Sequence, residues 1–230
     1  MKLLKSIIYT LLVCCLLAGN LFAQDWANLN RFKEENANVA LPSPDDVRVV
    51  FMGNSITEGW KNMRPEFFEG KAYYNRGISG QTTPQMLIRF RPDVIKLFPE
   101  VVVILAGTND IAGNTGPSTL EMIADNIKSM AELARAHGIK VIISSVLPAY
   151  DYPWKPGLNP ANKIPKLNEM LKAYAARHRM VYLDYFSAMA DDQNGLLEKY
   201  TYDGVHPNKE GYKAMEPLVE NAIVEAINNY

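Results

Sequence analysis

The sequence predicts an α/β domain of three layers, in which helices cover both faces of a parallel sheet of about five strands. The strand candidates are short runs, several of them almost wholly apolar and β-branched, as strands buried on both faces should be. They lie at residues 47–51, 72–74, 101–105, 141–144 and 181–183. Helical patterns separate these runs, and strands that alternate with helices pair in parallel. Ligands bind such sheets at the carboxyl ends of the strands, so we expect the chemistry in the loops that follow them.

Three helices stand out from the sequence pattern. Over residues 119–137 apolar residues recur at three- and four-residue spacing, which predicts a helix with one face against the sheet. Ser118 is expected to cap its start, Glu121 to complete a capping box and Gly138 to end it. Residues 164–179 and 209–228 are the next clearest helices, and we expect Pro217 to strain the last of these.

The first residues predict a secretory signal peptide rather than part of the fold. Lys2 and Lys5 precede an apolar run at residues 7–17, which is short for a membrane span, and Ala23 offers a cleavage site. A lipoprotein signal is the alternative, because two cysteines, Cys14 and Cys15, follow an apolar triplet. The residue before a lipidated cysteine is normally small, which Val13 and Cys14 fit poorly. We therefore expect a periplasmic or secreted protein.

The chain divides accordingly into a signal peptide at residues 1–23, an N-terminal arm at 24–44 and one domain at 45–230. Both cysteines fall within the signal, so we expect no disulfide, cysteine ligand or cysteine nucleophile in the mature protein. The formal net charge is −1. Without the two lysines of the signal it is about −3, which argues against a nucleic-acid partner. No second apolar run is long enough to suggest stable membrane insertion after cleavage.

Of the three histidines, His206 alone follows a carboxylate within a loop, in the motif Asp-Gly-Val-His-Pro at residues 203–207. Asp203 can reach its imidazole within one turn of chain, keep one ring nitrogen protonated and leave the other to accept a proton. His137 and His178 lie instead at expected helix ends, where a cation suits the exposed carbonyl groups. Considered alone, the pair could equally be an incidental surface turn.

Three further loops at strand ends complete a set of catalytic parts. Ser55 follows Gly53 and begins a helix, where a free backbone N–H and the helix dipole favour an oxygen that loses its proton. Gly80 lies in a glycine-containing loop that can point N–H groups at a ligand. Asn109 can aim its side-chain amide at a developing negative charge, a contribution of about 3–4 kcal/mol. Each has a plainer explanation alone, as an N-cap, a turn or an Asx-turn; together the four loops predict a serine esterase.

These motifs resemble the four blocks of the SGNH subgroup of the GDSL esterase/lipase family. The blocks are Gly-Asn-Ser at residues 53–55, Gly80, Gly-Thr-Asn-Asp at 107–110 and the motif at 203–207. The resemblance runs from about residue 47 to the C-terminus. It implies a flavodoxin-like sheet and a hydrolase with neither a metal nor an organic cofactor.

The resemblance also implies the role of each residue. Ser55 would be the nucleophile, His206 the base and Asp203 the acid that orients it, while the N–H groups of Ser55 and Gly80 and the side chain of Asn109 would form the oxyanion hole. One position departs from the family, which usually has aspartate where this chain has Asn54. Asparagine keeps the size and one acceptor oxygen but loses the charge. Asp184, at the end of the last strand, is a rival for the triad acid.

The substrate is less clearly indicated. The loop at residues 147–157 is long, stiffened by proline and aromatic, and Trp154 and Tyr152 could form a platform for the apolar face of a sugar. Aromatic residues also anchor long loops to the body of a protein. Arg76 could contact a substrate carboxylate or pair with Glu58.

We expect a small-molecule or glycan ester as substrate and short acyl groups on carbohydrates as the preferred target. The alternatives are an acylhydrolase that acts on lipid esters, such as a lysophospholipase or thioesterase, and a silent glycan-binding protein.

Overall fold

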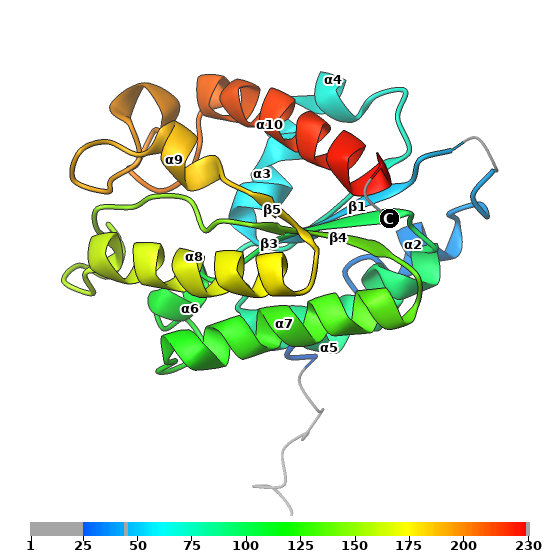
Figure 1. The fold of residues 1–230 in the computed structure, drawn as a ribbon, viewed down its shortest axis with the longest axis horizontal. Coiled ribbons are helices and arrows are strands. Elements are labelled where there is room, and N and C mark those ends of the chain that lie inside the picture. The colour runs from blue at the N-terminus through cyan, green and yellow to red at the C-terminus, as the bar shows by residue number, and fades with distance from the viewer. Residues whose placement is uncertain (1–24, 44–45, 229–230) are drawn as a thin grey trace, which may run out of the picture.

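The computed structural model describes residues 25–43 and 46–228, and Figure 1 shows helices on both faces of a twisted sheet. The strand order is β2-β1-β3-β4-β5, and all neighbouring strands pair in parallel. The strands are β1 (Val49–Gly53), β2 (Tyr73–Gly77), β3 (Val101–Leu105), β4 (Lys140–Ser144) and β5 (Val181–Leu183). The predicted three-layer α/β class is therefore confirmed, whereas the signal peptide predicted at residues 1–23 lies outside the described residues.

Two groups of helices bury the two faces of the sheet (Figure 1). One face carries α5 (Thr83–Asp93), α7 (Leu120–Ala136) and α8 (Pro160–Arg177), and the other carries α3 (Ser55–Met63), α4 (Pro65–Phe68), α9 (Tyr185–Met189) and α10 (Lys209–Asn228). Side chains alternate along β1, so that Val50 and Met52 enter the first core and Val49 and Phe51 the second. Burial on both faces explains why this strand is a continuous apolar run.

Shorter elements fill the connections. They are α2 (Lys33–Ala37), the 3₁₀ turns η1 (Ile95–Leu97) and η2 (Glu198–Tyr200), and α6 (Thr108–Ile111). Helix α6 begins shortly after the third strand, and its N-cap is Gly107. The Gly-Thr-Asn-Asp motif therefore lies at the carboxyl edge of the sheet.

An aromatic cluster fixes the helix that begins with Ser55. The side chain of Trp60 is 2% exposed. It stacks on Phe67, with ring centroids 5.0 Å apart, and on Tyr212 of α10, at 5.6 Å. Tyr212 also donates a hydrogen bond to the carbonyl oxygen of Ile56 (2.8 Å). Trp60 is therefore a core residue, and its contacts hold α3 against α10.

One local prediction about a helix needs correction. The N-cap of α7 is Thr119 rather than Ser118, and its side chain accepts a hydrogen bond from the N–H of Met122 (3.2 Å). The last helix, α10, covers the predicted residues 209–228 and runs through Pro217, because a proline inside a helix removes one N–H donor but packing along the rest of the helix can compensate. Gly138 follows α7 with a left-handed φ of 73°, as expected for a helix end.

Residues 25–43, the N-terminal segment, lie along strand β2, at the edge of the sheet. The segment is anchored by Ala27 and Phe32, which are 3% and 5% exposed. Arg76 of β2 bonds to Glu35 (2.9 Å) and to the side-chain oxygen of Asn36 (2.8 Å), and its guanidinium lies over the ring of Phe32. The segment therefore contributes to the core next to an edge strand that would otherwise be exposed.

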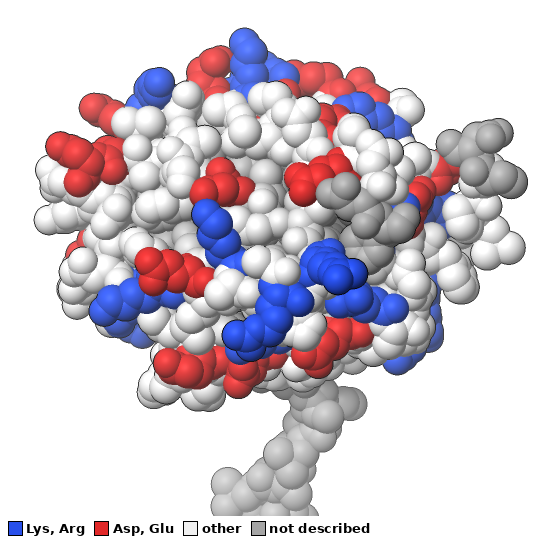
Figure 2. All heavy atoms as spheres, viewed as in Figure 1, with Lys and Arg blue, Asp and Glu red and all other residues white. Residues whose placement is uncertain are grey.

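Figure 2 shows acidic and basic side chains interspersed on the face formed by α7, α8 and α10. On the part of the chain that the structure describes, no helix is both long and apolar enough to cross a membrane.

Candidate active site

Ser55 is the first residue of α3, immediately beyond the carboxyl end of β1. Asn54 caps this helix, because its side-chain oxygen accepts a hydrogen bond from the N–H of Ile56 (3.0 Å). A side chain at Gly53 would collide with Thr57 and with the carbonyl oxygen of Leu105, so glycine is required for the tight strand-to-helix turn. Asparagine thus supports the loop through its neutral acceptor oxygen.

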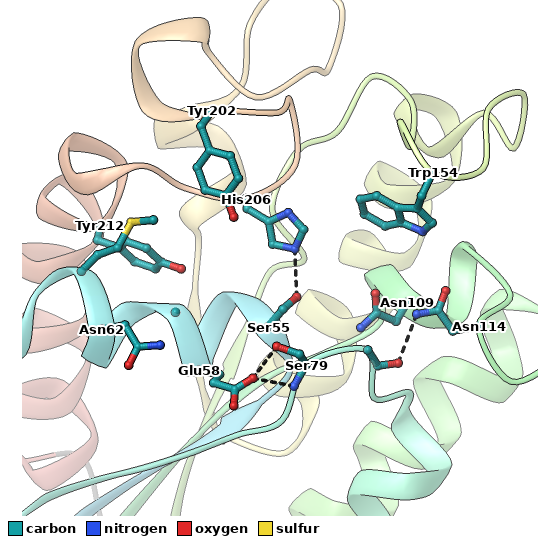
Figure 3. Close-up of a pocket in the computed structure, with 13 residues that line it drawn as sticks. Ser55, Glu58, Asn62, Ser79, Asn109, Asn114, Trp154, Tyr202, His206 and Tyr212 are labelled. Carbon is teal, nitrogen blue, oxygen red and sulfur yellow. Dashed lines mark hydrogen bonds between the residues drawn. The ribbon is translucent and has the colours of Figure 1, made fainter.

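A chain of two hydrogen bonds joins Ser55, His206 and Asp203 (Figure 3 shows the first). The Oγ of Ser55 lies 3.0 Å from Nε2 of His206. On the opposite side of the ring, Nδ1 lies 2.7 Å from a carboxylate oxygen of Asp203. This arrangement gives the hydroxyl a proton acceptor and gives that acceptor a fixed orientation.

The other carboxylate oxygen of Asp203 is held by the backbone. It accepts hydrogen bonds from the N–H groups of Val205 (2.9 Å) and His206 (2.7 Å). Burial acts to raise the pKa of this carboxyl, but the bonds from His206 and Val205 outweigh it and hold the pKa below its usual value. Asp203 therefore stays ionised beside the imidazole at neutral pH.

Gly80 and Asn109 line the same cavity as Ser55, and Figure 3 shows Asn109 in this cavity. The side-chain nitrogen of Asn109 donates one hydrogen bond to the carbonyl oxygen of Gln81 (3.0 Å), and an amide NH₂ has a second hydrogen to donate. Gly80 has a left-handed φ of 77°, and Asn114 donates to its carbonyl oxygen (3.1 Å). The backbone N–H groups of Ser55 and Gly80 have no hydrogen-bond partner among the described residues. Three donors are thus available near the serine hydroxyl.

The cavity above Ser55 is open and has a volume of about 520 Å³. Trp154 and Tyr202 flank the imidazole of His206, with ring centroids 5.7 and 5.8 Å from it, and Figure 3 shows the two aromatic rings on either side of the histidine. The cavity is lined by Ser55, Glu58, Gly59, Asn62, Met63, Ser79, Gly80, Asn109, Asn114, Trp154, Tyr202, His206 and Tyr212. Among these, Glu58 is the only acid or fixed charge, and it accepts hydrogen bonds from the backbone N–H and hydroxyl of Ser79.

Arg89 of α5 lies behind these loops and connects them. It is fully buried and donates to the side-chain oxygen of Gln81 (2.5 Å), to the carbonyl oxygen of Gly53 (3.0 Å) and to Asp93 (3.1 Å). Burial lowers its pKa to about 10, so it remains charged at neutral pH. The guanidinium of Arg89 therefore connects two loops: the one before Ser55, through Gly53, and the one that carries Gly80, through Gln81.

Asp110 anchors the third loop from the inside. Its carboxylate accepts hydrogen bonds from the backbone N–H (3.0 Å) and the hydroxyl (2.6 Å) of Thr83. Burial raises the pKa of Asp110 to about 6, although the bonds from Thr83 act in the opposite direction.

Comparison with known proteins identifies the family. The model of the GDSL-like lipase/acylhydrolase family matches residues 51–214, which include all four loops described above. The chain belongs to the GDSL-like lipase/acylhydrolase family. The prediction made from the four sequence motifs is therefore confirmed.

Several relatives of this GDSL family member are esterases or lipases by name. A GDSL-like lipase from Bacteroides thetaiotaomicron has the same fold, with a TM-score of 0.85 and 50% sequence identity over 87% of this chain and 98% of its own. An acetylxylan esterase from Xylanibacter ruminicola is 27% identical over 81% of this chain, and esterase TesA from Pseudomonas aeruginosa is 27% identical over 74% of this chain and 79% of its own length. The chain spans only 45% of the length of the acetylxylan esterase. These relatives support an ester hydrolase.

Two of the three residues expected to bind substrate do not line the cavity of this family member. Arg76 is fully buried and is satisfied by Glu35 and Asn36 instead of Glu58, so neither of its expected roles is correct. Tyr152 is also fully buried, and its hydroxyl lies 2.9 Å from that of Thr108. The structure corrects both expectations, and of the three it brings only Trp154 to the cavity.

The rival for the triad acid has another role. Asp184 caps α9 and accepts hydrogen bonds from the N–H (2.9 Å) and hydroxyl (2.8 Å) of Ser187. Sequence reasoning missed Tyr202, Asn114 and Glu58 as cavity residues. Tyr202 is adjacent to Asp203 in the chain, so its position beside the last motif was the one available signal. Within the described ranges, no group of three or more histidine, cysteine, aspartate or glutamate side chains could hold a metal ion.

Proposed function

We propose that this protein is an exported serine esterase that removes short acyl groups, acetyl above all, from carbohydrates. The observation that carries the proposal is the hydrogen-bonded series Ser55–His206–Asp203 at the edge of an open cavity. The basic and apolar start of the sequence supports export.

In the first half of the reaction His206 takes the proton of Ser55 through Nε2 as the hydroxyl oxygen attacks the ester carbonyl carbon. Asp203 keeps Nδ1 protonated and stabilises the imidazolium that forms. The negative charge on the former carbonyl oxygen is bound by the N–H groups of Ser55 and Gly80 and by the free hydrogen of the Asn109 amide. When the tetrahedral intermediate collapses, the imidazolium returns its proton to the leaving alcohol, and the acyl group remains on Ser55.

In the second half water replaces the alcohol. His206 takes a proton from the water as it attacks the acyl-enzyme, and the same three donors bind the second oxyanion. Collapse of this intermediate releases the carboxylic acid and returns the proton to Ser55. No other group is required to change its protonation state.

The walls of the cavity support a sugar as the alcohol part of the ester. Trp154 and Tyr202 are 46% and 62% exposed beside His206, where their rings can cover the apolar face of a pyranose. Asn62 and Asn114 provide amide groups for hydroxyls at the same cavity. The name of the related acetylxylan esterase points to the same chemistry.

The first test is hydrolysis of p-nitrophenyl acetate by the wild type and by Ser55→Ala. Because the serine oxygen forms the acyl-enzyme, we expect kcat to fall by about 10⁴-fold or more in the variant. Turnover by Ser55→Ala comparable to that of the wild type would exclude the proposed nucleophile. A fluorophosphonate probe that labels the wild type but not the variant would identify the modified residue directly.

Acyl-chain length then separates the carbohydrate proposal from lipid hydrolysis. We expect kcat/KM to fall steeply from acetyl to decanoyl p-nitrophenyl esters, and acetylated xylo-oligosaccharides to be deacetylated. Equal rates on acetyl and decanoyl esters, together with turnover of lysophospholipids, would favour the lipid acylhydrolase. Carbohydrate binding without turnover of any ester would favour a silent binding protein.

A further inference from the structure

A second cavity lies beside the active-site cavity, across the loop that carries Gly80. Its volume is about 360 Å³, and Ser79, Gly80 and Asn114 line both cavities. A side chain at position 80 would project into open space, since a Cβ placed there meets no atom within 4 Å. Because residue 80 is glycine, no side chain at this position fills the space where the two cavities meet.

The N-terminal segment supplies the outer wall of this second cavity through Trp26. The indole is 46% exposed, unlike that of Trp60 in the core. The backbone around it is fixed to the start of α5 and to the loop that carries Gly80, because Gln85 donates to the carbonyl oxygen of Trp26 (2.7 Å) and Gln81 donates to that of Ala27 (2.8 Å). The backbone that carries the ring is thus held in place before any ligand binds, which reduces the entropy cost of binding.

Polar groups with spare hydrogen-bonding capacity line the same cavity as the indole ring of Trp26. Asn28 lines the same cavity, and its side-chain amide has no hydrogen-bond partner among the described residues. Asn114 uses its nitrogen on the carbonyl of Gly80, which leaves its side-chain oxygen as an acceptor. An exposed indole beside amides with spare hydrogen-bonding capacity matches a sugar, which has an apolar ring face and polar hydroxyls at its edge.

We propose that this second cavity is a subsite for a neighbouring sugar unit of the glycan whose ester is hydrolysed at Ser55, with Trp26 as its platform. The proposal rests on the proposed carbohydrate esterase function and extends its substrate from a single acylated sugar to a chain. Asp25 is the only charged residue that lines the second cavity, and Glu58 is the only acid of the first. Glu58 is paired with Arg31 (3.5 Å), so Asp25 is the acid without a cationic partner among the described residues that line the cavities. A chain of neutral sugars therefore fits the second cavity better than a polyuronate, whose carboxylates Asp25 repels.

Binding can be tested without hydrolysis. In the full-length Ser55→Ala protein we expect calorimetry to detect unacylated xylohexaose or mannohexaose, and Trp26→Ala in the same background to raise Kd at least about tenfold, the loss of one stacking contact. The matched control is Phe98→Ala, since Phe98 is an aromatic residue of 60% exposure that lines neither cavity. It should leave Kd unchanged, and a hexamer of galacturonic acid should bind more weakly than the neutral hexamers.

Kinetics with active protein provide the second arm. Trp26→Ala should leave kcat/KM for p-nitrophenyl acetate within about twofold of wild type, and raise KM for acetylated xylohexaose with little change in kcat. An equal loss on both substrates would assign Trp26 a structural role and overturn the subsite, as would the absence of binding of both neutral hexamers to Ser55→Ala. If a hexamer binds through Trp26 but no ester is hydrolysed, the subsite stands and the proposed hydrolysis fails.

Discussion

At the scale of single residues, the geometry favours Asp203 over Asp184 as the acid that orients His206. Both aspartates were candidates from the sequence, because both follow elements that end at the same edge of the sheet. Only Asp203 contacts the imidazole, while Asp184 is engaged by Ser187 at the start of α9.

Replacement of each aspartate by asparagine tests this assignment. We expect Asp203→Asn to lower kcat by about 10³- to 10⁴-fold, because a neutral amide neither fixes the required tautomer nor stabilises the imidazolium. Asp184→Asn is the matched control, since asparagine can still cap α9, and it should retain nearly full activity on p-nitrophenyl acetate. The opposite ranking of the two variants would transfer the role to Asp184.

Asp110 gives a prediction about the pH dependence of stability. The pKa of the Asp110 carboxyl in the folded state is about 6, above its usual 3.8. The protonated carboxyl therefore adds to the free energy of unfolding at low pH, below about pH 4, and this contribution is lost as the pH rises through 6. In Asp110→Asn this loss is absent. We therefore expect the variant to gain roughly 2 kcal/mol in free energy of unfolding, relative to wild type, between pH 4 and pH 8.

Urea unfolding at several pH values measures this difference directly. The exposed Asp192→Asn serves as the control and should parallel the wild type at every pH. If the difference between Asp110→Asn and wild type stays constant from pH 4 to pH 8, the carboxyl does not titrate in that range in the folded protein.

At the scale of elements, α5 matters for the site although none of its residues lines the active-site cavity. Arg89 is its link to two loops, through Gln81 and Gly53. A lysine has a single ammonium group and cannot reproduce the planar fork that spans these acceptors.

We therefore expect Arg89→Lys to lower kcat for p-nitrophenyl acetate by about 10- to 100-fold with little change in KM, because small displacements of the reacting groups slow the reaction. Arg91→Lys, on the same helix but exposed, is the control. An Arg89→Lys enzyme with wild-type kcat would show that the loops keep their positions without the guanidinium.

The apolar runs allowed most elements to be predicted, because strands buried on both faces, such as Val101–Leu105, carry their own signal. The second strand was harder to delimit. It contains Asn75 and Arg76, whose polar side chains are buried and bond to residues far away in the sequence, Asn75 to Thr57 and Arg76 to Glu35 and Asn36. For the same reason the sequence could not show that Arg76 faces the N-terminal segment and not the cavity.

The catalytic candidates were easier to predict than the residues around them. Ser55, Asn109 and His206 lie in short motifs directly after strands or before helices, so the topology alone brings them together. Tyr152 and Trp154 belong to one aromatic loop, and only the folded chain determines which of the two is buried and which lines the cavity.

At the scale of the whole molecule, the N-terminal segment is part of the folded core. Phe32 is 5% exposed and lies under the guanidinium of Arg76. We expect Phe32→Ala to lower the free energy of unfolding by about 3–5 kcal/mol, as measured by denaturant titration.

Leu29→Ala in the same segment is the matched control, since Leu29 is 41% exposed. Its effect should stay within about 0.5 kcal/mol. If Phe32→Ala is equally mild, the segment does not contribute to the stability of the domain.

The two ends of the proposed catalytic hydrogen bond, Ser55 and His206, are 151 positions apart in the chain. A fragment that emerges first therefore holds the nucleophile but no base, and it cannot hydrolyse esters until the last loop has docked. Contacts between such distant segments form late, because the entropy cost of closing a long loop must be met first. Recovery of activity during refolding would consequently follow assembly of the complete domain, and the enzyme would stay silent at every earlier stage of its synthesis.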